Sequence, residues 1–264
     1  MTGERPLLYA HRGASAEAPE NTLAAFRIGL ARGADALEMD VRMTRDGVIV
    51  VIHDATGRRV AGAPAAVVAS TLDEVRRWEV GRDARVPTLE EVLLAFPDVP
   101  LNVDIKQREP DVVAPLLALL ARTGAAPRVR LTSFHTRILW RLRALGYPGP
   151  LGTSRADVIG ILAAPRDLVP WFIRRGDAVQ IPVRVGALRL DTPAVIDRCH
   201  SLGLRVDYWV INDLATARAL LGRGADGIMT DDPAAIVPAF RTPGSGAPPG
   251  ADRGAPSAPP TRGS

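Results

Sequence analysis

Residues 34–54 read ADALEMDVRMTRDGVIVVIHD and contain two apolar segments on either side of a turn. Residues 36–41 and 48–52 each have the length and composition of a buried β-strand. The short link, which ends in Thr44-Arg45-Asp46-Gly47, leaves no room for the crossover that a parallel pair needs. The two segments are therefore predicted to form an antiparallel hairpin.

The turn of this hairpin decides where His53 lies. If Asp46-Gly47 form a two-residue turn, His53 pairs opposite Asp40, and if Arg45-Asp46 form it, His53 pairs opposite Glu38. Both registers predict His53 on the strand face that carries Glu38 and Asp40. A three-residue bulged turn would instead place His53 on the other face.

The first hairpin strand belongs to a regular series of short apolar segments that alternate with helical patterns. The predicted strands of this series are 7–10, 36–41, 101–105, 129–132, 150–153, 178–181, 205–209 and 227–230. The predicted helices are 22–32, 88–95, 111–122, 136–145, 193–202 and 213–221. Eight strands in alternation with helices predict an α/β fold, a (β/α)₈ TIM barrel with the hairpin and a small insertion over its C-terminal mouth. The alternative, an open doubly wound sheet, is disfavoured because no GxGxxG follows the first strand.

The chain length and the local composition predict one domain. A chain of 264 residues suits a single α/β barrel, which we expect to span 1–241 with the insertion at about 54–87. Residues 242–264 are mostly Pro, Gly, Ala and Ser and have no apolar periodicity. Such a segment buries too little surface to offset its ordering entropy, so we expect a disordered tail.

The charge pattern argues against nucleic acid as a partner. The net charge is +4 and the isoelectric point about 9.9, but the arginines are scattered and aromatic residues make up only 5% of the chain. No apolar stretch approaches the roughly 20 residues of a membrane helix, and too few residues precede Leu7 for a signal peptide. We expect a cytoplasmic protein without stable membrane insertion. The sequence does not indicate an oligomeric state.

Acidic residues collect where the predicted strands end, which is where barrels carry their reactive groups. Glu38 and Asp40 are two residues apart on one strand, so their carboxylates point to the same side. Asp104 lies near the end of the next barrel strand. Three oxygen donors without a thiolate suit a hard divalent cation, Mg²⁺ or Ca²⁺. A solvated strand face is the alternative, but the strand is otherwise apolar and unpaired carboxylates inside a barrel are costly.

Lysine and histidine are rare in this chain, and they occur beside these acids. Lys106 is the only lysine, and its compact ammonium group can contact a phosphate oxygen. His11 and His53 are two of the four histidines, and both follow predicted strands. A pair of imidazoles can share the general-base and general-acid steps at a phosphoester.

Ordered motifs cover nearly the whole chain before the tail. They are HRG at 11–13, PENT at 19–22, EMDV at 38–41, TRDG at 44–47, HD at 53–54, PTLEE at 87–91, NVDIK at 102–106, SF at 133–134, WVIND at 209–213 and GADGIMTD at 224–231. Together they resemble the glycerophosphodiester phosphodiesterase family, in its bacterial, cytoplasmic type.

The resemblance implies a metal-dependent hydrolase that converts glycerophosphodiesters to glycerol 3-phosphate and an alcohol. It implies these roles: acid–base catalysis by His11 and His53, binding of a divalent metal by Glu38, Asp40 and Asp104, phosphate contacts from Arg12 and Lys106, and a substrate pocket lined by Trp209. One departure stands out, because the family usually has glutamate where this chain has Asp104. The shorter side chain can shift the ion, recruit a water as ligand or change the metal preference.

Two alternative functions follow from the same residues. One is a lysophospholipase D-like phospholipid diesterase, which would need an apolar rim, whereas residues 55–86 contain no obvious amphipathic membrane helix. The other is a catalytically silent barrel that binds phosphodiesters, which a metal site weakened at Asp104 would produce.

Overall fold

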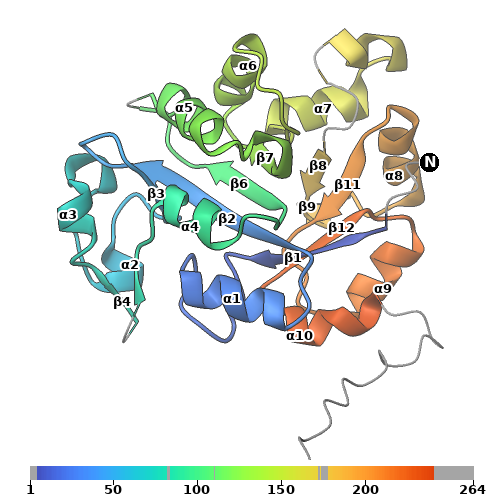
Figure 1. Cartoon of the computed structure of the whole chain (residues 1–264). Coiled ribbons are helices and arrows are strands. Elements are labelled where there is room, and N and C mark those ends of the chain that lie inside the picture. The colour runs from blue at the N-terminus through green and yellow to red at the C-terminus, as the bar shows by residue number, and fades with distance from the viewer. Residues whose placement is uncertain (1–4, 82–83, 110, 172, 174–177, 241–264) are drawn as a thin grey trace, which may run out of the picture.

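Parallel strands form a barrel surrounded by helices (Figure 1). The computed structural model describes residues 5–81, 84–109, 111–171, 173 and 178–240. Seven strands follow one another in the order β7, β6, β2, β1, β12, β11 and β8. Their bounds are β1 Leu7–His11, β2 Ala36–Met43, β6 Leu101–Ile105, β7 Val129–Thr132, β8 Ala178–Ile181, β11 Arg205–Tyr208 and β12 Gly227–Thr230.

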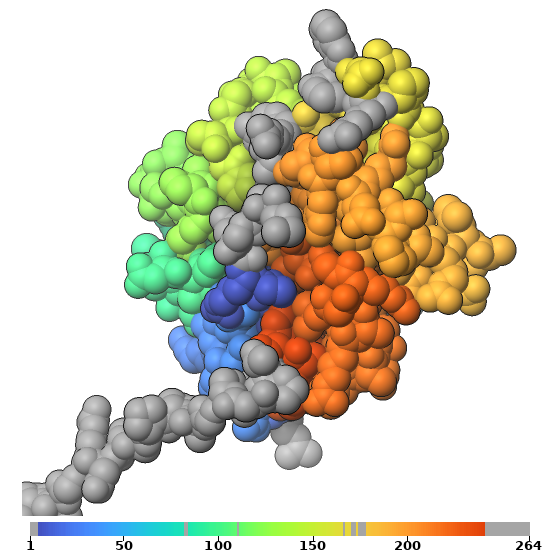
Figure 2. Space-filling view, turned by 90° about the vertical axis from the view of Figure 1, so that its right-hand side faces the viewer, coloured from blue at the N-terminus to red at the C-terminus, as the bar shows by residue number. Residues whose placement is uncertain are grey.

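The eighth strand position closes the ring. Leu151 bridges Leu131 of β7, and Gly152 bridges Ala178 of β8, both in parallel orientation. The predicted strand at 150–153 is therefore present as two bridges that join the ends of the sheet. The first and last strands also pair, and Figure 2 shows the blue start of the chain against the red-orange segment near its end. The predicted (β/α)₈ TIM barrel is confirmed.

Helices follow the barrel strands and cover their outer faces (Figure 1). The longer ones are α1 Leu23–Ala31, α4 Leu89–Ala95, α5 Val113–Thr123, α6 Thr136–Ala144, α7 Arg155–Ala163, α8 Pro193–Ser201 and α9 Leu214–Gly222. The barrel also contains short helical segments: η2 Ala126–Arg128, η3 Arg166–Trp171, α10 Pro233–Ile236 and η4 Val237–Ala239. The expected capping box of Thr88 and Glu91 begins α4.

Strand β2 illustrates how the barrel positions polar groups inside a hydrophobic shell. Leu37, Met39 and Val41 belong to the apolar core between strands and helices. The intervening residues, Glu38 and Asp40, point the other way and line the cavity at the barrel mouth. The alternation of β2 thus separates core packing from the site.

Neither of the two registers predicted from a two-residue turn forms, and the hairpin has the three-residue turn that was the alternative. Strand β3, Ile49–Val51, pairs with β2 so that Val51 lies opposite Val41, which excludes pairing of His53 with Asp40 or Glu38. The cause is a three-residue loop, 45–47, closed by a hydrogen bond from Thr44 N to Val48 O (3.0 Å), with Gly47 at φ 84°. Because β3 ends at Val51, His53 leaves the ladder and still lines the cavity with Glu38 and Asp40.

The insertion after the hairpin packs around a small core of its own. It contains α2 Arg58–Ala61, η1 Val67–Ala69, α3 Leu72–Val75, β4 Glu79–Val80 and β5 Ala84–Arg85. Val67, Val75 and Trp78 pack with Val50 and Ile52 of the hairpin. A second small hairpin, β9 Arg184–Val185 and β10 Leu188–Arg189, follows β8.

Two further predictions concern the C-terminal tail and the absence of a membrane helix. The predicted tail, 242–264, lies outside the described residues. Across the described part of the chain, the helices are too short or too polar for any of them to traverse a lipid bilayer.

Candidate active site

A cavity of about 340 Å³ lies at the carboxyl ends of the barrel strands. All eight residues predicted for the site line it: His11, Arg12, Glu38, Asp40, His53, Asp104, Lys106 and Trp209. They come from β1, β2 and β6 and from the segments that follow β1, β3, β6 and β11. The barrel therefore brings together side chains that are up to 198 residues apart, from position 11 to position 209.

His11 ends β1 and is held by a carboxylate from the opposite end of the chain. Its Nδ1 lies 2.7 Å from Asp231 Oδ1. Asp231 also accepts hydrogen bonds from Ser15 Oγ (2.8 Å) and Asn212 Nδ2 (2.8 Å). Burial lowers the pKa of His11, but the charge of Glu38 and the hydrogen bond to Asp231 outweigh burial and raise that pKa above its usual value. Nε2 remains on the cavity side, 3.8 Å from Glu38 Oε2.

His53 has an equivalent partner in the next residue. Its Nδ1 lies 2.7 Å from Asp54 Oδ1, and its backbone carbonyl accepts a hydrogen bond from Arg42 Nε (2.9 Å). Burial raises the pKa of Asp54, but hydrogen bonds from Arg59 and His53 bring it down to about 2. A carboxylate on Nδ1 favours the tautomer that leaves Nε2 free to exchange a proton. Both rings therefore present the same nitrogen to the site.

Asp40 is the most densely paired acid in the cavity. Lys106 Nζ lies 3.0 Å from Oδ1, and Arg12 Nε and Asn21 Nδ2 each lie 3.0 Å from Oδ2. Burial raises the pKa of Asp40, but the charges of Lys106 and Arg12 and the hydrogen bond from Asn21 outweigh burial, so the pKa is lowered. Asp40 is therefore ionised at neutral pH.

The other two acids, Glu38 and Asp104, have raised pKa values, in contrast to Asp40. Burial, and then repulsion from Asp40, raises the pKa of Glu38 to about 7. Burial also raises the pKa of Asp104, although Lys106 Nζ lies 2.5 Å from its Oδ2. Asp104 Oδ1 is buried, and within the described residues it has no hydrogen-bond partner. The site therefore has one buried carboxylate oxygen without a hydrogen-bond partner and two carboxyl groups that bind protons more readily than usual.

These donors fit a hard divalent cation by their chemistry. As placed, Lys106 Nζ stands between Asp40 and Asp104, and the described residues include no three carboxylate, imidazole or thiol groups already gathered around one point. A cation at this position would compete with Lys106 for both carboxylates.

The backbone around Arg12 and Gly13 explains the HRG motif. Arg12 has φ 55° and its N–H donates to Glu38 Oε2 (3.0 Å). Gly13 has φ 84°, and a Cβ there would lie 2.6 Å from the backbone of Ala25. Only glycine tolerates both the left-handed conformation and this close approach. The strained turn thus aims two consecutive residues, His11 and Arg12, at the cavity.

Asn21 connects this turn to Asp40. It has φ 57°, and its N–H donates to Arg12 O (2.8 Å). Its side chain donates to Asp40 Oδ2 (3.0 Å) and accepts from Asp40 N (3.2 Å). Asn21 therefore fixes the position of Asp40 relative to Arg12.

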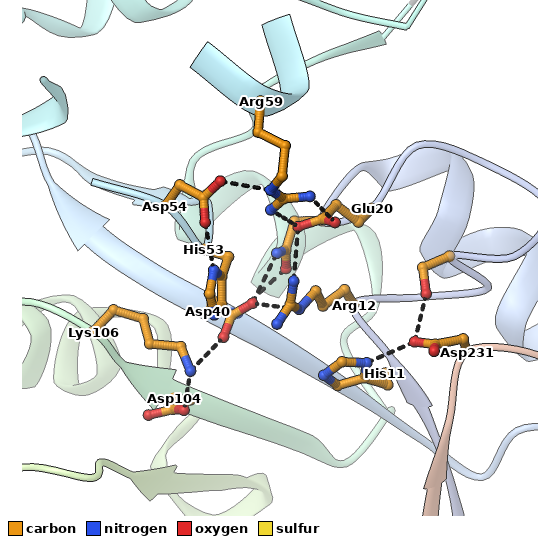
Figure 3. A network of polar contacts seen from close by, with 12 residues as sticks. His11, Arg12, Glu20, Asp40, His53, Asp54, Arg59, Asp104, Lys106 and Asp231 are labelled. Atoms are coloured by element: carbon orange, nitrogen blue, oxygen red, sulfur yellow. Dashed lines mark hydrogen bonds and ion pairs between the residues drawn. The ribbon is translucent and has the colours of Figure 1, made fainter. Parts of the chain in front are cut away.

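The insertion contributes a positively charged bridge above the site (Figure 3). Arg59 of α2 donates from Nε to Asp54 Oδ2 (2.6 Å), from Nη1 to Glu20 Oε2 (2.6 Å) and from Nη2 to Glu20 Oε1 (2.8 Å). Glu20 in turn accepts from Arg12 Nη1 (3.0 Å). Arg59 thereby links Asp54, which contacts His53, to Glu20, which contacts Arg12.

Several of these supporting residues were not predicted. Glu20, Asn21, Asp54 and Asp231 lie inside the quoted motifs, but the sequence alone assigned them no role. Arg59 lies outside every motif, and nothing in the sequence distinguishes it from its neighbour Arg58. Its two carboxylate contacts depend on tertiary structure.

The remaining cavity wall is aromatic near the rim and polar at the floor. Trp209 packs edge-on against Phe134, with ring centroids 5.8 Å apart at 76°. At the floor, Gln180 Nε2 donates to Asn102 Oδ1 (2.8 Å). The cavity therefore offers hydrogen bonding at its inner end and apolar surface at its outer end.

Comparisons with known proteins agree on one family. The glycerophosphoryl diester phosphodiesterase family matches residues 11–235. A probable glycerophosphodiester phosphodiesterase 2 of Mycobacterium tuberculosis is 36% identical over 84% of this chain and 86% of its own, and a glycerophosphodiester phosphodiesterase of Caldanaerobacter subterraneus is 30% identical over 88% and 97%. The structure of an Oleispira antarctica phosphodiesterase in complex with the product sn-glycerol-3-phosphate is similar in fold, with a TM-score of 0.76 at 24% identity. The match covers 89% of this chain and 97% of that one. This chain therefore belongs to the glycerophosphoryl diester phosphodiesterase family.

Proposed function

We propose that this protein hydrolyses glycerophosphodiesters to glycerol 3-phosphate and an alcohol. The observation that carries the proposal is the pair of imidazoles, His11 and His53, each with its Nδ1 on a carboxylate and both lining a cavity that also contains Arg12 and Lys106. The names of the relatives, and the product bound to the Oleispira antarctica protein, support the substrate class.

The two histidines share the proton transfers. One Nε2 accepts the proton of the nucleophile, which is either water or the substrate's own glycerol hydroxyl, and the other Nε2 donates a proton to the departing alkoxide. Attack by the glycerol hydroxyl gives a cyclic phosphate, which water then opens to glycerol 3-phosphate. The ring that accepts a proton becomes an imidazolium, and the ring that donates one is an imidazolium before it does so. Asp231 and Asp54 stabilise these two cations through the hydrogen bonds at Nδ1. The same two carboxylates hold the rings in place before the reaction begins.

The cations of the site act on the phosphate. Arg12 and Lys106 place two positive charges beside the phosphodiester and stabilise the additional charge that develops on its oxygens. We propose that Glu38, Asp40 and Asp104 hold Mg²⁺ or Ca²⁺, which supplies further positive charge to the same oxygens when bound. The unpartnered Oδ1 of Asp104 and the raised pKa of Glu38 support this assignment.

The activity is tested by incubating the purified full-length chain with a panel of glycerophosphodiesters and lysophosphatidylcholine in the presence of Mg²⁺ or Ca²⁺. We expect glycerol 3-phosphate from the glycerophosphodiesters. Failure to cleave any of them would favour the silent binding barrel, and faster cleavage of lysophosphatidylcholine would favour the phospholipid diesterase.

The metal is tested separately by chelation and by calorimetry. Excess chelator should stop hydrolysis, and added Mg²⁺ or Ca²⁺ should restore it. Calorimetric binding of the same ions should weaken in Glu38→Gln and stay unchanged in Glu17→Gln, whose side chain lies on the surface against Arg32. Full activity in chelator would contradict the metal assignment while leaving the hydrolase assignment intact. The cytoplasmic location and the absence of a nucleic-acid partner stay predictions from the sequence.

A further inference from the structure

Arg155 is a cavity residue that the hydrolytic steps do not use. It is the first residue of α7 and lines the cavity. Ser154 and Asp157 fix the start of this helix through a capping box. The other cationic side chains of the cavity, Arg12 and Lys106, are both paired with Asp40. Throughout the described residues, by contrast, no carboxylate forms an ion pair with Arg155.

Arg155 and Lys106 both lie near the ring of Phe134. Its guanidinium carbon lies 5.2 Å from the centre of the Phe134 ring, and Lys106 Nζ lies 5.2 Å from the same centre. Both distances are within the range of cation–π contacts. An aromatic ring at the mouth of such a cavity could otherwise receive the quaternary ammonium of a choline group. In this protein, two cations of the chain already lie on that ring.

The charges of the cavity are separated along its depth. Glu38, Asp40 and Asp104 are buried at the inner end, with at most 7% of each residue exposed. Phe134 is 39% exposed, and Arg155 is exposed as well. His135, which follows Phe134, has a lowered pKa, first because of burial and then because of Arg108, Lys106 and Arg155. The outer end is therefore positive and the inner end negative.

The different groups at the two ends of the cavity favour different parts of a glycerophosphodiester. The inner end offers Asn102 and Gln180 as hydrogen-bonding groups, which suit the hydroxyls of glycerol. The alcohol on the other side of the phosphate then extends toward Phe134 and Arg155. A guanidinium binds carboxylate and phosphate groups through its planar fork, and it repels an ammonium group.

We propose that Arg155 and Phe134 form a headgroup subsite that selects glycerophosphodiesters with an anionic leaving alcohol over those with choline. The proposal rests on the proposed function, because it concerns the second arm of the same substrate. Arg155 contacts the substrate without taking part in proton transfer. Its effect is therefore expected mainly in KM.

The test compares kcat/KM for glycerophosphoinositol 4-phosphate, glycerophosphoglycerol and glycerophosphocholine. For the wild type we expect the anionic substrate to exceed the choline substrate by about 3- to 10-fold, since an exposed charge pair contributes modestly. Arg155→Gln should bring the ratio close to one, and Arg155→Glu should reverse it. Added salt should compress the wild-type ratio, because it screens exposed charges.

Matched variants keep the result interpretable. Arg218→Gln on α9 changes another exposed arginine outside the cavity and should leave the ratio unchanged. Arg155→Glu should fold, because a glutamate in the first turn of a helix is favourable. A wild type that prefers choline, or a ratio that is the same in wild type and Arg155→Glu, would overturn the proposal. Failure of every diester to react would instead contradict the proposed function.

Discussion

His11 Nδ1 lies 2.7 Å from Asp231 Oδ1, and this contact joins the end of the first barrel strand to the segment after the last one. Because β1 and β12 are neighbours in the barrel, residues separated by 220 positions meet at its mouth. Closure of the barrel therefore also brings His11 into contact with its carboxylate partner, Asp231.

Replacement of Asp231 by asparagine should reduce catalysis without unfolding the protein. The amide keeps the size of the side chain but can no longer stabilise an imidazolium or fix the tautomer of His11. We expect kcat to fall by at least about tenfold with little change in KM. Asp73→Asn, which changes an exposed acid on α3, is the control and should retain wild-type kcat. An unchanged kcat in Asp231→Asn would show that Asp231 does not support proton transfer by His11.

The same substitution should change how stability depends on pH. Burial raises the pKa of Asp231, but hydrogen bonds from His11, Asn212 and Ser15 bring it to about 2. An unfolded aspartate titrates near about 3.9, so this group stabilises the fold above about pH 4, and the contribution is lost as the pH falls toward 2. The difference in Tm between wild type and Asp231→Asn should be full at pH 6 and disappear near pH 2. A difference that stays constant over this range would contradict the assignment.

Arg59 should matter for activity although it lies outside the cavity lining. Its guanidinium bridges Asp54 and Glu20, so Arg59→Ala should loosen both His53 and Arg12 and lower kcat by about tenfold or more. Arg59→Lys should recover only part of the loss, because one ammonium cannot reproduce three directed hydrogen bonds. Steady-state kinetics of both variants, beside Arg58→Ala on the same helix, provide the measurement. Equal activities of Arg58→Ala and Arg59→Ala would show that the bridge is dispensable.

Gly13→Ala should be far more damaging than an alanine at another left-handed glycine. At Gly13 the added Cβ meets the backbone of Ala25 at 2.6 Å, whereas at Gly124, φ 65°, it meets nothing within 4 Å. We expect Gly124→Ala to cost about 1–2 kcal/mol of unfolding free energy from backbone strain alone. Gly13→Ala should cost about 2–5 kcal/mol, because overpacking adds to the strain. Chemical denaturation measures both, and similar values for the two variants would refute the role of close packing.

Much of the barrel follows from local sequence because its strands are short apolar runs. The strand predicted at 101–105 forms as β6, and Asp104 near its end lines the cavity as expected. Helix α7, Arg155–Ala163, was not predicted, because its apolar residues are adjacent instead of spaced along one face, and Ile159 is 67% exposed. Such a helix is determined by its capping box and its place in the barrel.

The sequence predicted those site residues whose type or position is conspicuous. It did not predict features that depend on tertiary geometry. His11 and Lys106 are conspicuous because histidine and lysine are rare in this chain, and Asp104 because it lies near the end of a predicted barrel strand. The hairpin register could not be derived, because Asp46-Gly47 suit both a two-residue turn and the three-residue loop that forms. The bridge from Arg59 to Glu20 spans 39 positions and has no local signal.

The most direct test of the two-histidine mechanism is the rate of glycerol 3-phosphate release by His11→Ala and His53→Ala, with His200→Ala as the control. His200 lies on α8, where its Nε2 contacts Asp226 Oδ2 (2.7 Å), outside the cavity. We expect the first two variants to lose at least about 10²-fold in kcat while keeping the wild-type fold by circular dichroism, and the control to keep its rate. Near-native hydrolysis by either His11→Ala or His53→Ala would contradict the shared proton transfer.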